Sequence, residues 1–111
     1  LFARSVAECL AAQLAERDRK IGGTNLKTNG QVAKLQTIKD NNEDYVPPRE
    51  MLRELMQDNK QMAAAMRKAH DVCDEAGDIA SASILENFID ETERRTWFLF
   101  EASRQEGSNA A

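Results

Sequence analysis

A run of mostly apolar residues, spaced by alternating steps of three and four, constrains this chain more than any other feature. The run comprises Leu52, Leu55, Asn59, Met62, Met66, Ala69, Cys73 and Ala76. Such steps bring side chains onto one face of an α-helix, so the run predicts a long helix whose seam packs against a partner helix along its length. Pro48 suits the first helical turn because it lacks an amide hydrogen, and Gly77 suits a left-handed cap at the end.

A second long helix is predicted directly after Gly77. Asp78 is suited to its N-cap, where the carboxylate accepts hydrogen bonds from unpaired amides at the positive end of the helix dipole. The apolar face of this helix comprises Ile79, Ala82, Leu85, Phe88, Ile89, Leu99 and Phe100. Because so little chain separates the two helices, we expect them to run antiparallel as a hairpin.

The N-terminal part predicts a third long helix and a long connection. Apolar residues recur at helical spacing over residues 1–21 and stop at Gly22 and Gly23. The connection over residues 23–47 is longer than is usual between neighbouring helices, and it contains a short amphipathic helix at 28–39. We expect one partial domain over residues 1–104 and a disordered C-terminal tail over residues 105–111, which lack periodicity.

Composition agrees with an all-α protein and argues against membrane insertion, secretion and direct DNA binding. The 111 residues are 41% apolar and 31% charged, with two prolines and five glycines. No apolar stretch approaches the roughly 20 residues of a membrane helix and no secretory signal precedes the fold, so a cytoplasmic protein is expected. The net charge of −4 argues against direct DNA binding, which normally needs a basic excess. Cys9 and Cys73 lack the spacing of a zinc site.

Several short motifs spread over residues 14–103 are specific enough to indicate a family. They are Ala15-Glu16-Arg17, Ile21-Gly22-Gly23, Tyr45-Val46-Pro47, Ala80-Ser81-Ala82-Ser83, Leu85-Glu86-Asn87, Ile89-Asp90-Glu91, Glu93-Arg94-Arg95 and Trp97-Phe98-Leu99. This series resembles the second, third and fourth helices of the DNA-binding proteins from starved cells, the Dps branch of the ferritin-like superfamily. The resemblance implies an all-α, ferritin-like helical bundle with three long helices and a short helix in the crossover, lacking the first helix of a four-helix bundle.

The resemblance also implies a function. Dps subunits form a hollow, dodecameric shell, oxidise ferrous iron with peroxide and store the ferric product, which protects DNA from oxidative damage in starvation and stationary phase. Iron is therefore the expected metal and a homo-oligomer the expected assembly, without a membrane partner. DNA is a further partner that the resemblance implies and the charge does not support; a DNA-bound protein would lie at the nucleoid.

The ferroxidase site of the family lies between two subunits. It joins histidines from the first helix of one subunit to two carboxylates, four residues apart, on the second helix of the other. Glu16 stands at the position of the second carboxylate, whereas Ala12 occupies the first, and the histidine-bearing helix is absent. Glu16 is thus a partial iron ligand, with a salt-bridged surface glutamate as the alternative, and no complete catalytic set is identified.

Acidic residues around Gly77 suggest a second place for metal ions. In the family, acidic residues of this region line the three-fold pores through which iron enters, which makes Asp78 and Glu86 candidates. The alternatives are helix capping for Asp78 and an ordinary polar surface for Glu86. His70, three residues before Cys73, is interpreted as structural. The alternative function is a catalytically silent helical module that pairs with another chain through an unfilled apolar groove.

Overall fold

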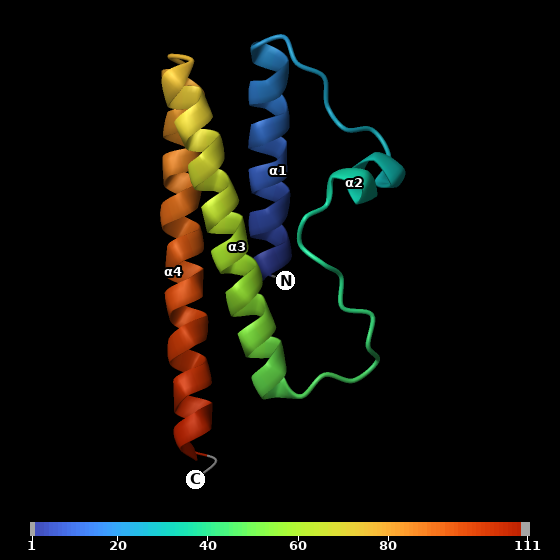
Figure 1. Cartoon of the computed structure of the whole chain (residues 1–111), viewed down its shortest axis with the longest axis vertical. Coiled ribbons are helices and arrows are strands. Elements are labelled where there is room, and N and C mark those ends of the chain that lie inside the picture. Colours follow the sequence, from blue (N-terminus) through green and yellow to red (C-terminus); the bar gives the residue numbers. More distant parts are fainter. Residues whose placement is uncertain (1, 110–111) are drawn as a thin grey trace. The chain divides into compact units, whose positions relative to one another are not determined.

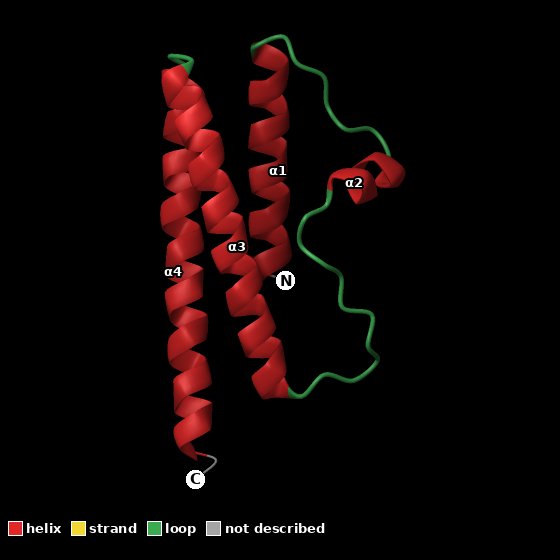
Figure 2. Ribbon diagram, in the orientation of Figure 1, coloured by secondary structure: helices red, strands yellow, loops and turns green. Residues whose placement is uncertain are grey.

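The computed structural model describes residues 2–109 of the chain, and side chains over residues 9–104. Four α-helices and no strand are found in this part of the chain, as Figure 2 shows. The helices are α1 (Phe2–Lys20), α2 (Asn29–Leu35), α3 (Pro48–Glu75) and α4 (Ile79–Asn109), labelled in Figure 1. The prediction of an all-α chain with three long helices and a short helix in the crossover is confirmed. Among the described residues, no helix combines the length and the apolar character needed to cross a membrane.

The chain divides into two compact units, and the first, Leu1–Thr37, contains α1 and α2. Gly22 ends α1 with a φ of 92°, a left-handed conformation that glycine adopts without a steric penalty. The amide of Gly23 donates a hydrogen bond of 2.8 Å to the carbonyl of Asp18, as expected for such a cap. Thr28 caps α2, its Oγ1 accepting a hydrogen bond of 3.1 Å from the Gln31 amide. This helix ends at Leu35, earlier than predicted, because the Gln36 backbone is extended.

The second unit, Ile38–Ala111, contains α3 and α4. These helices pack side by side as the predicted antiparallel hairpin (Figure 1). Gly77 turns the chain with a φ of 75°, and the Asp78 amide donates a 2.8 Å hydrogen bond to the carbonyl of Cys73. Pro48 occupies the first turn of α3, as predicted. The backbone of α4 remains helical to Asn109, beyond Ser103, where the apolar pattern stops; the side chains of 105–111 lie outside the described residues.

The contact line between α3 and α4 differs from the predicted seam. Leu52, Asn59, Met66 and Cys73 are buried or half-buried, but the intervening positions that contribute are Met56, Ala63 and His70. The predicted Leu55, Met62 and Ala69 are exposed. On a helix, the residues three and four positions after a contact residue lie on opposite sides of the contact line. The position of the neighbouring helix therefore decides which of these two residues is covered. The seam prediction was therefore wrong at every second position.

The core of the hairpin is small and includes a buried hydroxyl. Its buried apolar residues are Ala63 and Met66 from α3 and Ala82, Leu85 and Phe88 from α4. Thr92 is fully buried; its Oγ1 donates to the Phe88 carbonyl at 2.7 Å and accepts from Arg95 at 2.8 Å. The Nε of Arg95 also donates to Oδ1 of Asn59 at 3.2 Å. This network links α3 to α4 through polar groups that the apolar pattern did not reveal.

Candidate functional site

The predicted iron ligand Glu16 lies near the end of α1. Its side chain is exposed, and α1 ends with the cationic residues Arg17, Arg19 and Lys20. Ala12, one helical turn earlier, supplies no ligand atom, so α1 offers only one of the two carboxylates expected on this face. Iron binding by Glu16 stays a prediction.

Asp78, a candidate pore residue, has a structural role at the start of α4. Its Oδ1 accepts a hydrogen bond of 3.2 Å from the Ser81 amide, three residues further along the helix. The geometry is that of an N-cap, which satisfies one of the amides left unpaired at a helix start. The capping interpretation of Asp78 is therefore confirmed, while a role in iron entry stays a prediction.

Glu86, the second candidate pore residue, pairs with a histidine that was interpreted as structural. Nε2 of His70 on α3 lies 3.0 Å from Oε1 of Glu86 on α4. The carboxylate is mostly exposed, whereas the imidazole is about one-quarter exposed, so the pair sits at the edge of the helix contact. The antiparallel register around Gly77 contained the signal for this pair, because the two positions are equally distant from Asp78.

The ability of this pair to bind a metal ion is limited because it provides only two ligand atoms. An imidazole nitrogen and a carboxylate oxygen are donors that suit ferrous iron and other divalent transition metals. Within the described side chains, however, no group of three or more His, Cys, Asp or Glu residues is placed to hold a metal ion. The pair can offer two protein ligands on an exposed surface, and further positions would have to come from water or another chain.

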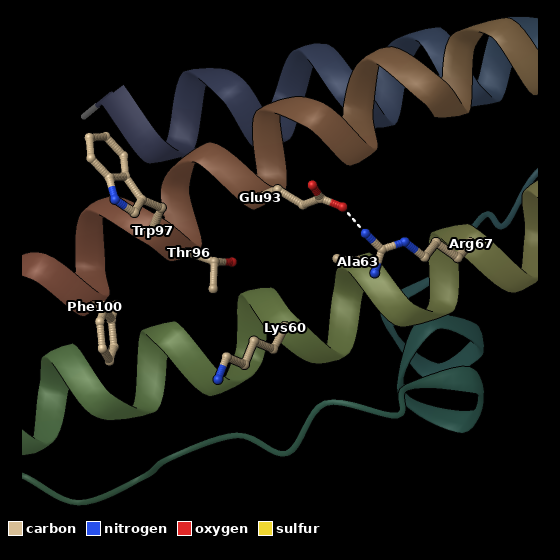
Figure 3. Close-up of a pocket in the computed structure, with 7 residues that line it drawn as sticks. All are labelled: Lys60, Ala63, Arg67, Glu93, Thr96, Trp97 and Phe100. Carbon is tan, nitrogen blue, oxygen red and sulfur yellow. Dashed lines mark hydrogen bonds and ion pairs between the residues drawn. The ribbon is translucent and has the colours of Figure 1, made fainter.

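A groove lies further along the hairpin, between α3 and α4 (Figure 3). It has a volume of about 320 Å³ and is lined by Lys60, Ala63, Arg67, Glu93, Thr96, Trp97 and Phe100. An ion pair between Arg67 and Glu93 lies at one end, and the two aromatic residues lie at the other. Phe100 extends toward α3 in this view, whereas the Trp97 indole extends away from it. The groove thus combines apolar walls with a cationic side chain, Lys60.

Sequence reasoning only partly anticipated the groove. Trp97 was identified only as part of a family motif, and its side chain is exposed beside the groove. Lys60 and Arg67 were not singled out, and Glu93 was named only within a family motif, because a charged residue on an amphipathic helix normally lies on its solvated face. Only the pairing of the helices shows that these charges border apolar side chains.

Comparisons with known proteins identify a family without identifying a near relative. The sequence matches the family model of the ferritin-like domain over residues 7–104. Neither a curated protein nor a solved structure matches the chain. The match covers α2, α3 and most of α1 and α4, and thus most of the sequence.

Proposed function

The chain belongs to the ferritin-like family, and we propose that it acts as a Dps-type subunit that binds ferrous iron, promotes its oxidation by peroxide and stores the ferric product. The carrying observation is the family match over residues 7–104, which joins the helix bearing Glu16 to the hairpin in one ferritin-like domain. Iron storage or ferroxidase-type activity is the function that this family suggests. The choice of peroxide, a dodecameric shell and protection of DNA come from the Dps resemblance.

The charge distribution of the hairpin supports a role in attracting metal cations. Between His70 and Glu91 the sequence contains no Lys or Arg and seven carboxylates: Asp71, Asp74, Glu75, Asp78, Glu86, Asp90 and Glu91. Carboxylates concentrated at one end of a hairpin produce a negative potential that raises the local concentration of divalent cations. We propose that Asp78 and Glu86 take part in iron entry through this field, and that Asp78 does so while capping α4.

The oxidation step requires little of the protein beyond holding iron. Each peroxide accepts two electrons, one from each of two ferrous ions, and takes up protons to leave as water, while the ferric ions pass to the stored mineral. We propose that Glu16 is one ligand at the oxidation site. Because Ala12 provides no second carboxylate, the remaining ligands would come from another subunit.

Anaerobic titration of the protein with ferrous iron, followed by addition of peroxide, tests this function. We expect saturable binding and rapid formation of ferric iron in the wild-type protein. Glu16→Gln should weaken binding by roughly tenfold because it removes a charged ligand, while Glu43→Gln, an exposed change in the loop before α3, is the matched control. Binding that is absent in the wild type would refute the proposal, and equal binding by both variants would exclude Glu16.

A second candidate function is a catalytically silent module that pairs with another chain through its helices. Its motivation is the lack of a three-ligand group among the described side chains, together with exposed apolar positions such as Leu55, Met62 and Phe98. This function predicts stable association and no iron-dependent consumption of peroxide. Light scattering of the eluted protein, combined with the iron titration, separates the two functions, since only the first predicts both a large shell and peroxide consumption.

A further inference from the structure

A second hollow lies nearer the start of α3 than the groove described above. It has a volume of about 330 Å³ and is lined by Arg49, Arg53, Met56, Phe100, Ser103 and Arg104. Phe100 lines both hollows, so they meet at its ring. We call the two together the cationic groove.

Several cations of the cationic groove are available to a partner. Within the described part of the chain, Arg49, Arg53 and Lys60 have no carboxylate partner. Arg104 differs, since it pairs with Glu101 at 3.6 Å; its guanidinium carbon also lies 5.7 Å from the centre of the Phe100 ring, which keeps a positive charge beside an apolar surface. A surface of this kind fits a partner that presents carboxylates around apolar side chains.

The opposite end of the same hairpin has that composition. Residues 71–79, which we call the acidic tip, contain Asp71, Asp74, Glu75 and Asp78 and no Lys or Arg. Two large apolar side chains are uncovered there, Val72 at 66% and Ile79 at 82% exposure. The tip therefore combines negative charge with apolar contact area, as the cationic groove combines positive charge with aromatic rings.

The dimensions of the two surfaces also agree. Arg53 and Arg67 are separated by about 21 Å along α3 at the helical rise of 1.5 Å per residue. A tip made of two packed helices, each about 10 Å across, is about 20 Å wide. Because the tip and the groove lie at different positions along the same two straight helices, a tip cannot reach the groove of its own hairpin.

We infer that the acidic tip of one copy of this chain docks into the cationic groove of a second copy. Ile79 then packs against Phe100 and Trp97, and the tip carboxylates of Asp74 and Glu75 face Lys60 and Arg53, while Asp78 keeps its capping hydrogen bond. Two different surfaces make the contact heterologous, so successive copies form a ring if the rotation closes and a filament if it does not. The inference rests on the self-association in the proposed function and is independent of its iron chemistry, so failed association and failed iron uptake are separate results.

Sedimentation velocity of the full chain over a range of protein and salt concentrations tests this contact. The wild type should associate, and the association should weaken as salt screens the charges. The groove variant Arg53→Glu/Lys60→Glu and the tip variant Asp74→Lys/Glu75→Lys should each raise the Kd for self-association about tenfold or more, because like charges then face one another. Matched charge changes outside both surfaces, Lys34→Glu/Lys39→Glu and Glu43→Lys/Asp44→Lys, should leave the Kd unchanged.

Mixing the two variants provides the decisive measurement. The unaltered groove of the tip variant can accept the unaltered tip of the groove variant, so an equimolar mixture should associate more tightly than either variant alone. Circular dichroism of each variant should show intact helices, because all the altered residues are exposed. A wild type that stays monomeric, or a mixture that fails to associate, overturns the inference. Binding of a labelled single-stranded oligonucleotide that only the groove variant loses, without self-association, would overturn it in favour of a nucleic acid.

Discussion

Nε2 of His70 and Oε1 of Glu86 lie 3.0 Å apart across the contact of α3 and α4. Both residues are eight positions from Asp78, so the pair reports the register of the whole hairpin. Asn59 and Arg95 form a second hydrogen bond between the same two helices, further from the turn. Polar pairs at the edge of the contact thus accompany the apolar core in aligning the two helices.

The His70–Glu86 pair should contribute little to stability despite its geometry, because the Glu86 carboxylate is mostly exposed and solvent screens the interaction. A double-mutant cycle with His70→Ala and Glu86→Gln should give a coupling free energy of about 0.2–1 kcal/mol. The measurement is guanidinium denaturation followed by circular dichroism. A coupling of several kcal/mol would show that the pair is buried or joined to a larger network in the assembled protein.

Thr92 should contribute more to the stability of the hairpin than its size suggests, because its buried hydroxyl accepts a hydrogen bond from Arg95. Thr92→Val keeps the shape of the side chain but leaves the guanidinium without this partner, and should lower the free energy of unfolding by about 1–2 kcal/mol. Thr96→Val is the matched control, since the only hydrogen bond described for the Thr96 hydroxyl is donated to the Thr92 carbonyl at 2.9 Å. The control should change stability by less than about 0.5 kcal/mol. Equal losses in the two variants would mean that the Arg95 contact is unimportant.

Two phenylalanines of α4 should differ sharply in their contribution to stability. Phe88 is 6% exposed and Phe98 is 67% exposed. Phe88→Ala opens a cavity in the hairpin core and should cost about 3–5 kcal/mol, whereas Phe98→Ala should cost less than about 0.5 kcal/mol in the isolated chain. Urea denaturation of both variants gives the comparison. A large loss for Phe98→Ala that depends on protein concentration would place this side chain in an interface between copies.

Gly77 should be difficult to replace for a backbone reason alone. A Cβ atom added there meets no atom within 4 Å. The φ of 75°, however, is left-handed, and most residues with a side chain adopt this conformation only at a cost in energy. Gly77→Ala should therefore destabilise the hairpin by about 1–2 kcal/mol, and Gly77→Asn by less. Thermal denaturation of the two variants checks the order. If alanine is tolerated as well as asparagine, the turn has another conformation available.

The sequence alone determined which segments are helical and where the hairpin turns. Pro48, Gly77 and Asp78 act through local geometry and nearby hydrogen bonds, so their roles could be predicted without knowledge of the fold. The family was also visible in the sequence at the level of the ferritin-like superfamily, because residues 7–104 match its domain. The observed ends of α2 and α4 differ from the predicted ones, since weak helical segments near a terminus or in a connection lack a strong apolar pattern.

Only the tertiary structure decided which side of each helix is covered. Met62 is larger and more apolar than Ala63, yet Ala63 is buried and Met62 is exposed, because the position of the neighbouring helix selects between residues on either side of the contact line. The same choice brings His70 to Glu86 and places Lys60 in the same groove as two aromatic residues. Helical periodicity reports the spacing of side chains along one element, whereas a site depends on distances between elements that are remote in the sequence.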